Sequence, residues 1–329
     1  MTPLAPILES FFTERLITQR RASPHTIASY RDTFRLLFGF AYTRTGKPPS
    51  RLDLTDLDAP MIAAFLDHLE HERHNSVRTR NARLVAVHSL FRYAALREPA
   101  HAGLIQRVLA IPQKRFERAD VNFLVLNEIE ALLASPDQTT WTGRRDHAVL
   151  LVMVQTGVRV SELTGLCCRD VSLSTGPHVR SHGKGRKERC TPLTAQTVAA
   201  LRSWMRERDG APDSALFPSR RGTRLSRDAI EKLIDKHAAT AEQRCPSLAA
   251  KPVTPHTLRH SCAMELLRSG VDSSVIALWL GHESIQSTQM YLHADMTIKQ
   301  RALDRTTPPD IRPGRYLAPD SLLAFLDGL

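Results

Sequence analysis

Four short segments in the second half of the chain contain side chains that could bind an anion, move protons or attack an electrophile. They offer arginine and lysine cations, several histidines and a tyrosine hydroxyl, which are the groups used in general acid–base and nucleophilic catalysis. The segments are TGVRVSEL (156–163), HGKGRKER (182–189), PHTLRHSCA (255–263) and LGHESIQSTQMYLHA (280–294).

Each segment also has an ordinary explanation when it is taken alone. Arg159 and Glu162 have the i, i+3 spacing of an ion pair on a surface helix. The segment 182–189 lacks the glycine and Lys-Ser/Thr spacing of a phosphate-binding loop. Isolated residues such as His282 and Tyr291 are commonly satisfied polar or core residues, so none of these segments identifies a site by itself.

One pair of histidines has the spacing of a helical zinc site. His256 and His260 are four residues apart, but Thr257 stands where the zinc-protease motif has glutamate. A metal site at these histidines is therefore a weak alternative, and we expect no metal and no other cofactor.

The order of the four segments is more specific than any one of them. T-G-x-R-x-x-E-L, G-K-G-x-x-K-E-R, H-x-L-R-H and L-G-H with a tyrosine nine residues later follow one another along the chain. This order resembles the tyrosine recombinase family, which includes phage integrases and Xer-like enzymes. The resemblance implies a site-specific DNA recombinase that cuts and rejoins DNA through a 3′-phosphotyrosyl intermediate.

The resemblance also implies partners and an architecture. The expected fold is mainly α with a small antiparallel β-sheet, in which an N-terminal helical bundle and a catalytic domain clamp double-stranded DNA. Enzymes of this family act as four protomers on two paired recombination sites, so we expect a homo-tetramer on DNA, and a second partner recombinase is an open alternative. The reaction would serve DNA integration or excision, or transposition, without ATP.

The residue types fit this chemistry. Tyr291 would attack the phosphodiester, and the phosphotyrosyl bond would conserve the ester energy for rejoining. Arg159 and Arg259 would bind the non-bridging phosphate oxygens, since their planar guanidinium groups stay charged at working pH.

Three further residues complete the expected catalytic set. Lys184 would protonate the leaving 5′-hydroxyl, with Lys187 as the competing lysine that the resemblance disfavours. His256 would act as general base or as a hydrogen-bond donor to the phosphate, and His282 would donate to a non-bridging oxygen.

Other residues near these motifs have supporting or structural interpretations. Glu162 is expected to support its neighbours, with a purely structural ion pair as the alternative, and His260 is expected to have a packing or supporting role. The remaining tyrosines are unsuited to be the nucleophile because they lie in a Pro/Gly-rich loop or in the predicted N-terminal bundle: Tyr316, Tyr30, Tyr42 and Tyr93.

The elements that must position these residues follow from periodicity and capping signals. Helical patterns cover 127–134 and 145–155, short β-compatible segments around Gly-Lys-Gly predict a β-hairpin over 179–193, and helix signals return from Ser226. Nearer the N-terminus, Ser23-Pro24, Asp58-Ala59-Pro60 and Ser76 predict helix starts. With a segment around 7–17, they indicate a bundle of about four helices over residues 1 to about 96.

The predicted domain organisation has four parts. The resemblance implies that residues 1–110 form a SAM-like core-binding domain, and the polar, basic stretch 111–120 is predicted to be a linker. Residues 121–310 form the catalytic domain and residues 311–329 a C-terminal tail. Apolar residues of the tail could dock on a neighbouring protomer or within the same chain.

Charge favours a polyanionic partner. The 329 residues contain 45 Lys and Arg against 34 Asp and Glu, a formal net charge of +11. Residues 1–118 hold 18 basic and 11 acidic residues, so the smaller part is the more basic for its size. Arg78, Arg80 and Arg83 cluster near the start of a helix, where they could contact a DNA backbone. A solvated helix face is the alternative.

Composition excludes several classes of protein. The apolar runs are too short for a membrane span, and the N-terminus lacks the basic region of a signal peptide, so a cytoplasmic location is expected. The five cysteines are odd in number and contain no C-x-x-C pair, which favours reduced thiols over disulfides or a cysteine zinc site.

Three alternatives to a recombinase stay open at this point. A DNA-binding accessory protein would keep the fold without cutting, although all six catalytic-type residues are present. A type IB topoisomerase would share the phosphotyrosyl chemistry but relax DNA without a specific site. A zinc hydrolase built on His256 and His260 would be inhibited by chelators.

Overall fold

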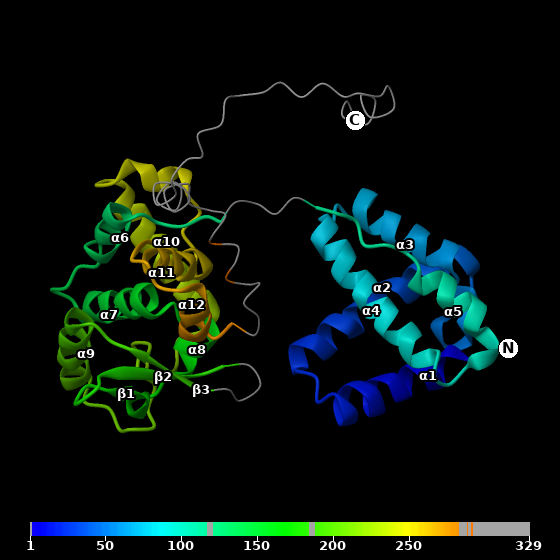
Figure 1. Cartoon of the computed structure of the whole chain (residues 1–329), viewed down its shortest axis with the longest axis horizontal. Coiled ribbons are helices and arrows are strands. Elements are labelled where there is room, and N and C mark those ends of the chain that lie inside the picture. Colours follow the sequence, from blue (N-terminus) through cyan, green and yellow to red (C-terminus); the bar gives the residue numbers. More distant parts are fainter. Residues whose placement is uncertain (1, 117–120, 184–187, 283–287, 289–290, 292–329) are drawn as a thin grey trace, which may run out of the picture. The chain divides into compact units, whose positions relative to one another are not determined.

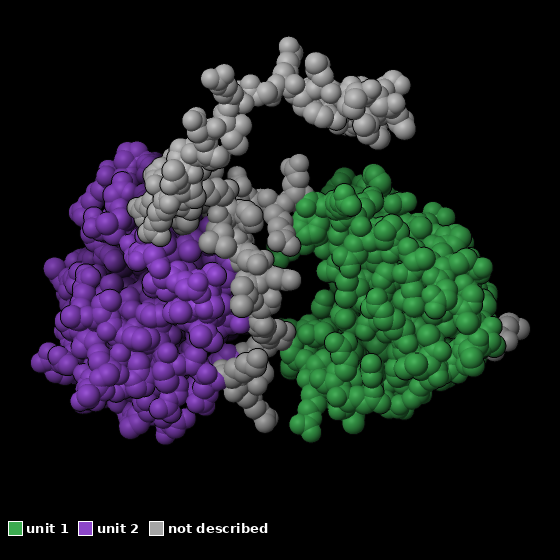
Figure 2. Space-filling model, viewed as in Figure 1, with its two compact units in different colours: residues 1–119 green, residues 120–329 purple. Residues whose placement is uncertain are grey.

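The computed structural model describes residues 2–116, 121–183 and 188–282, together with Thr288 and Tyr291. The chain divides into two compact units, residues 1–119 (unit 1) and residues 120–329 (unit 2), each with its own hydrophobic core (Figure 2). Both units are mainly helical, and unit 2 contains a small antiparallel sheet (Figure 1). The predicted fold class is therefore confirmed.

Unit 1 is a bundle of helices around one apolar core. Aromatic side chains from successive helices meet there, and Phe11, Phe34, Phe65 and Phe91 are at most 2% exposed. The first helix continues directly into a π-helical segment, η1. The helices are α1 (Leu4–Ser10), η1 (Phe11–Gln19), α2 (Pro24–Thr45), α3 (Ala59–His71), α4 (Val77–Ala94) and α5 (Ala102–Leu109).

The helix starts predicted from capping residues are confirmed. The side chains of Ser23, Asp58 and Ser76 each accept a hydrogen bond from the backbone N–H three residues later, at the starts of α2, α3 and α4. Gly46 ends α2 in the left-handed conformation, with φ of +70°. These local signals act within one turn, which is why the sequence predicts them.

The helical bundle extends beyond the predicted limit near residue 96. Helix α5 buries Ile105 and Val108 against the core, and the carbonyl of Val108 is hydrogen-bonded to the ring of His88. Past α5, Asn81 of α4 makes two hydrogen bonds to the backbone of Lys114. The first part of the expected linker 111–120 is therefore attached to unit 1.

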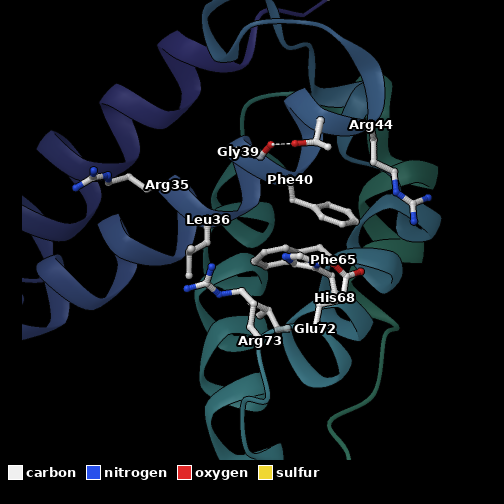
Figure 3. Close-up of a pocket in the computed structure, with 11 residues that line it drawn as sticks. Arg35, Leu36, Gly39, Phe40, Arg44, Phe65, His68, Glu72 and Arg73 are labelled. Carbon is white, nitrogen blue, oxygen red and sulfur yellow. Dashed lines mark hydrogen bonds and ion pairs between the residues drawn. The ribbon is translucent and has the colours of Figure 1, made fainter.

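A cavity of about 390 Å³ opens between α2 and α3 in unit 1. Figure 3 shows that the ring of Phe40 points towards Phe65 and His68, whereas the arginines lie around this apolar centre. This cavity belongs to unit 1, whereas the candidate catalytic residues belong to unit 2, so it is not the site of the chemistry considered below.

Unit 2 packs its helices around a core that includes Trp204, Leu150 and Leu258. Helices α7 and α11 contact each other, and α7 also contacts α9. The sequence analysis did not anticipate α9. The helices are α6 (Leu126–Leu133), α7 (Trp141–Thr156), α8 (Val160–Gly165), α9 (Ala195–Arg208), α10 (Arg227–Glu242), α11 (Pro255–Arg268) and α12 (Ser273–Leu280).

The sheet lies at one end of unit 2 in Figure 1, where β2 contacts α8. Strands β2 (His178–His182) and β3 (Glu188–Pro192) form the predicted hairpin, and the two-residue strand β1 (Val171–Ser172) pairs with β2. The β2–β3 register pairs Ser181 with Arg189 and Val179 with Thr191. Because side chains alternate along a strand, these four residues share one face, and that face is directed into unit 2.

Several predicted features lie outside the described residues. They are Lys184, Lys187, Tyr316 and the tail 311–329. Among the described residues, no helix combines the length and apolar character needed to cross a membrane. All five cysteines are described and are free thiols.

Candidate active site

The predicted catalytic residues that the structure describes gather where helices α7, α11 and α12 end or begin in unit 2. The ring of Tyr291 lies next to the imidazoles of His260 and His282, with centroid distances of 5.5 and 6.3 Å. Arg259 is close enough to Tyr291 to influence the pKa of its hydroxyl. Residues of α11 and the residue that follows α12 by two positions therefore meet at Tyr291.

Arg259 is buried and bonded to the C-terminal ends of two other helices. Its Nη1 donates to the carbonyl of Gly157 at 2.6 Å, after α7, and its Nη2 donates to the carbonyl of Leu280 at 2.7 Å, at the end of α12. Helix C-termini leave carbonyls unpaired and attract cations, so these bonds fix the guanidinium. Three of its five N–H donors are left for a ligand.

The guanidinium of Arg259 stays protonated although it is buried. Burial, and then the neighbouring Arg159 and Arg189, lower the pKa of Arg259 to about 10. The group is still protonated at neutral pH, but its charged form is less favourable there than in water. An incoming anion would relieve this cost.

Arg159 stands at the start of α8 and is held in a similar way. Its Nη2 donates to the carbonyl of Gly281 at 2.9 Å, and its Nη1 donates to Glu162 at 2.8 Å. The Arg159 side chain is 35% exposed, so a ligand can reach it. The two arginines thus use adjacent carbonyls at the end of α12, which places them next to each other.

Glu162 forms the predicted ion pair with Arg159, but the pair is not on the surface. The carboxylate is only 3% exposed and also accepts two hydrogen bonds from Arg189 on β3, at 2.8 and 3.0 Å. Burial alone would raise the pKa of Glu162, but hydrogen bonds from Arg189 and Arg159 outweigh it and leave the pKa below its usual range. Glu162 therefore stays ionised and connects Arg189 of the hairpin to Arg159.

Arg189 is a site residue that the sequence analysis did not single out. The available signal was strand alternation, because Arg189 shares the inward face of the sheet with Thr191. That alternation indicates burial of the side chain but does not identify its partner. Only the packing of β3 beside α8 pairs Arg189 with Glu162.

Glycines at the ends of α7 and α12 allow the backbone there to pack closely against neighbouring side chains. Gly157 and Gly281 end α7 and α12 with φ of +61° and +65°, a conformation that favours glycine. A Cβ atom on Gly157 would lie 2.5 Å from the side chain of Leu280, and one on Gly281 would lie 2.9 Å from the guanidinium of Arg189. The glycines of the T-G and L-G-H motifs therefore permit both the turns and the contacts.

Tyr291 is 1% exposed, and its hydroxyl is hydrogen-bonded to Nδ1 of His260 at 2.9 Å. Burial raises the pKa of Tyr291 to about 12, although Arg259 acts in the opposite direction. The hydroxyl is therefore protonated at neutral pH. The sequence analysis expected His260 to have a packing or supporting role, whereas the structure places it in direct contact with the tyrosine hydroxyl.

The other two histidines differ in their surroundings. His282 is half-buried, and its Nδ1 is 2.8 Å from the hydroxyl of Thr288. Burial and the nearby Arg259 and Arg159 lower the pKa of His282 to about 4, so its ring is neutral at pH 7. His256 is exposed on the first turn of α11, and its ring centroid is 6.4 Å from that of His260.

The ionised groups at this site carry an excess of positive charge. Arg159, Arg189 and Arg259 provide three cations, and Glu162 is the anion that pairs with two of them. Both nearby imidazoles are neutral. The site is therefore suited to bind a phosphate group next to a tyrosine hydroxyl.

The described residues offer no comparable arrangement for a metal ion. Within them, no cluster of three or more His, Cys, Asp or Glu side chains could hold one. His256 and His260 share a helix face, but His260 is bonded to Tyr291. The zinc alternative is therefore not supported by the side chains around these histidines.

The arginines considered for DNA contact do not share one surface. Arg80 is 5% exposed, and its Nη1 donates to the carbonyl of Pro112, so the expectation that it lies with the others on a solvent face is wrong. Arg83 is half-buried and bonds to residues of α2, at Ser29 and Thr33. Arg78 is exposed. The physical reason is helix periodicity, which turns position 80 towards the segment after α5.

A buried tyrosine beside arginines suited to phosphate, in a two-unit helical fold, is typical of enzymes that transfer DNA strands through tyrosine. Two family models match the chain: "Phage integrase family" over residues 122–297 and "Phage integrase, N-terminal SAM-like domain" over residues 10–98. The chain belongs to the phage integrase family and is a tyrosine-type site-specific recombinase.

Two relatives are similar over nearly the whole chain. The putative integrase/recombinase y4rC of Sinorhizobium fredii is 56% identical over 99% of this chain and 98% of its own length. Tyrosine recombinase XerC of Pelobacter propionicus is 32% identical over 93% of this chain and 97% of its own length.

Solved structures share the fold at lower identity. XerH recombinase in a post-cleavage complex with palindromic difH substrate gives a TM-score of 0.65 at 23% identity, covering 87% of this chain and 81% of that chain. The Tn1549 transposon integrase with circular intermediate DNA gives 0.69 at 14% identity, covering 93% of this chain and 100% of that chain.

Proposed function

We propose that the protein cuts and rejoins double-stranded DNA at a specific site through a 3′-phosphotyrosyl bond to Tyr291. The observation that carries this proposal is the buried tyrosine hydroxyl beside Arg259, within a group of side chains whose cations outnumber its anions. The XerH and Tn1549 structures were obtained with DNA, which supports DNA as the substrate. The reaction serves integration, excision or transposition.

Arg159 and Arg259 bind the two non-bridging oxygens of the scissile phosphate. Both guanidiniums are held by backbone carbonyls before substrate arrives, so little reorganisation is needed when negative charge grows in the transition state. Arg189 supports this role because it shares the carboxylate of Glu162 and so leaves Arg159 only partly neutralised.

Two histidines add donors to the same phosphate. The Thr288 hydroxyl can donate to Nδ1 of His282, which then carries its proton on Nε2 and offers that N–H to a non-bridging oxygen. His256, exposed on the first turn of α11, donates to the phosphate from the solvent side. Lys184, which follows β2 in sequence, protonates the leaving 5′-oxygen.

We extend the proposal to the partners. Unit 1 contributes to DNA binding through its positive charge, and Arg78 and Arg83 are its candidate phosphate contacts. The working assembly is a homo-tetramer on paired sites in the cytoplasm, in which a second recombinase could replace half of the subunits. No cofactor is required.

Covalent trapping tests this function. The protein is mixed with nicked DNA fragments from the flanks of its own gene in excess EDTA, and a complex that survives SDS is sought beside Tyr291→Phe. We expect a wild-type adduct that the variant does not form. Relaxation of plasmids without site preference would indicate a topoisomerase, and salt-sensitive binding without any adduct on any fragment would contradict the proposal.

A further inference from the structure

Attack by Tyr291 requires that the proton of its hydroxyl leave. The hydroxyl is buried and, with a pKa of about 12, is protonated at neutral pH. A group in direct contact with the oxygen has to take this proton as the bond to phosphorus forms. The sequence analysis gave this step to His256 as one of two possible roles, and the function proposed above uses His256 only as a donor to the phosphate.

The structure places one imidazole nitrogen at hydrogen-bond distance from this hydroxyl. Nδ1 of His260 is 2.9 Å from it, and the two rings meet edge to face. The Nδ1 atom of His282 is instead bonded to Thr288. His256 is exposed and stacks on the ring of His260, with a centroid distance of 6.4 Å.

We propose that Nδ1 of His260 is the acceptor for the phenolic proton of Tyr291, and thus the general base of DNA cleavage. This inference rests on the function proposed above and assigns a residue to one of its steps. His256 then serves the phosphate, and the adjacent residues Arg259 and His260 act on the phosphate and the nucleophile respectively.

Burial and the neighbouring charges keep the His260 imidazole neutral, which is the form that can accept a proton. Burial, and then His256 and Arg259, lower the pKa of His260 to about 4. The groups near it are those two residues and Tyr291, and His282 is close enough for His260 to influence its pKa. At neutral pH the ring is neutral, so Nδ1 has a lone pair for the hydroxyl proton.

The same values show why the proton does not move before attack. The hydroxyl holds its proton far more tightly than His260 in the resting state, so the two share a hydrogen bond only. As the tyrosine oxygen bonds to phosphorus it loses electron density and becomes acidic, while the bound phosphate stabilises a positively charged imidazole. Transfer is therefore concerted with attack.

The step balances in atoms and electrons. The Tyr291 oxygen forms a bond to phosphorus, the bond from phosphorus to the 5′-oxygen breaks, and the phenolic proton moves to Nδ1 of His260. The leaving 5′-oxygen takes a separate proton from the general acid. On rejoining, the 5′-oxygen bonds to phosphorus and returns its proton to the general acid. The bond from phosphorus to the Tyr291 oxygen breaks, and His260 returns its proton to that oxygen.

The first test compares single-turnover cleavage of nicked DNA by His260→Asn, His260→Ala and the wild type. The Asn side chain places an oxygen near the Nδ1 position, so it keeps the hydrogen bond but cannot take the proton. We expect both variants to cleave about 10²–10⁴-fold more slowly than the wild type. A rate for His260→Asn within about threefold of wild type would show that His260 only positions the tyrosine.

The pH profile separates a base from a structural residue. The wild-type rate should be level above about pH 6, because His260 is already neutral there. In His260→Ala, hydroxide must replace the base, so the rate should rise about tenfold per pH unit. His256→Ala, the matched histidine one turn earlier, should be slow without gaining this slope. A defect of His260→Ala that is independent of pH would overturn the proposal.

A measurement on the free protein does not depend on DNA cleavage. Nitrogen-15 NMR of labelled histidine should show His260 neutral, with its proton on Nε2, and its Nδ1 resonance should shift in Tyr291→Phe. A proton on Nδ1 would overturn the inference, because that nitrogen could not then accept. If this signature is found while no DNA is cleaved, the proposed function fails and the hydrogen bond stands.

Discussion

At the scale of single residues, the burial of an arginine side chain decides whether it can contact a ligand or only stabilise the fold. Arg78 is exposed near the start of α4, whereas Arg80 on the same helix is 5% exposed and bonded to the carbonyl of Pro112. The two residues are identical in charge and almost adjacent in sequence. Their roles differ because one guanidinium faces solvent and the other completes an internal hydrogen bond.

This difference predicts opposite effects of two alanine substitutions. Arg78→Ala should lower the slope of log affinity against log salt concentration by about one, because one phosphate contact is lost, and should leave stability unchanged. Arg80→Ala should lower the free energy of unfolding by about 2 kcal/mol and leave the salt slope unchanged. DNA-binding titrations at several salt concentrations and urea unfolding measure both. An unchanged slope in Arg78→Ala would remove this residue from the interface.

Glu162 gives a prediction in which stability depends on pH. Its folded-state pKa is lowered, so its contribution is present above about pH 4.5 and is lost as the pH falls through the folded-state value. Glu162→Gln should lower the free energy of unfolding at neutral pH by about 3 kcal/mol, because two guanidiniums lose their anion.

The control is Glu231→Gln, an exposed glutamate of α10 in the same unit, which should change stability by less than about 0.5 kcal/mol. Urea unfolding at neutral and acidic pH measures both variants. The difference between Glu162→Gln and the wild type should shrink on acidification. A difference that stays constant down to about pH 3 would contradict the lowered pKa.

At the scale of elements, the site is assembled from helix ends. Helices α7 and α12 both stop at glycines with positive φ, and the carbonyls exposed there hold Arg259 and Arg159. A helix that ran on by one turn would pair those carbonyls internally and leave the guanidiniums without partners. The termination of two helices thus positions both arginines of the candidate site.

Gly157→Ala tests this arrangement. The left-handed φ costs an alanine about 1 kcal/mol, and the new Cβ would overlap Leu280, so unfolding free energy should fall by about 3 kcal/mol. Cleavage should slow by about 10²-fold as the carbonyl that holds Arg259 moves. Gly270→Ala is the matched control, with φ of +83° and open space around it, and should lose about 1 kcal/mol with normal cleavage. Equal effects of the two substitutions would show that backbone strain alone matters.

At the scale of the whole molecule, the described residues form three apolar clusters, one in unit 1 and two in unit 2. The core of unit 1 is formed within residues 4–108, and the cores of unit 2 lie within residues 124–291. Each unit therefore buries its own apolar surface, which is the condition for folding alone.

Two fragments test this independence. Residues 1–116 and residues 121–329, produced separately, should each unfold in one cooperative transition in urea, because each retains its complete core. Circular dichroism and tryptophan fluorescence follow these transitions, and all three tryptophans lie in the second fragment. A fragment without a cooperative transition would show that its core depends on the other unit.

The local features of this protein could be predicted from its sequence because their causes are local. Capping side chains act within one turn, a glycine can adopt positive φ by itself, and strand alternation is built into the backbone. The starts of α2, α3 and α4 and the hairpin over 179–193 follow from such signals. The family follows from the order of four motifs, which is also a property of the sequence.

The tertiary structure alone decided which groups touch. Glu162 has the spacing to pair with Arg159, but its second partner, Arg189, comes from a strand 27 residues away. The contact between His260 and Tyr291 spans 31 residues and depends on how Tyr291 packs beside α11. Capping, turn and strand-alternation signals act over a few residues and cannot predict contacts between residues this far apart in the sequence. These contacts arise because burying apolar surface brings distant segments together, and the polar groups then pair with whatever that packing places beside them.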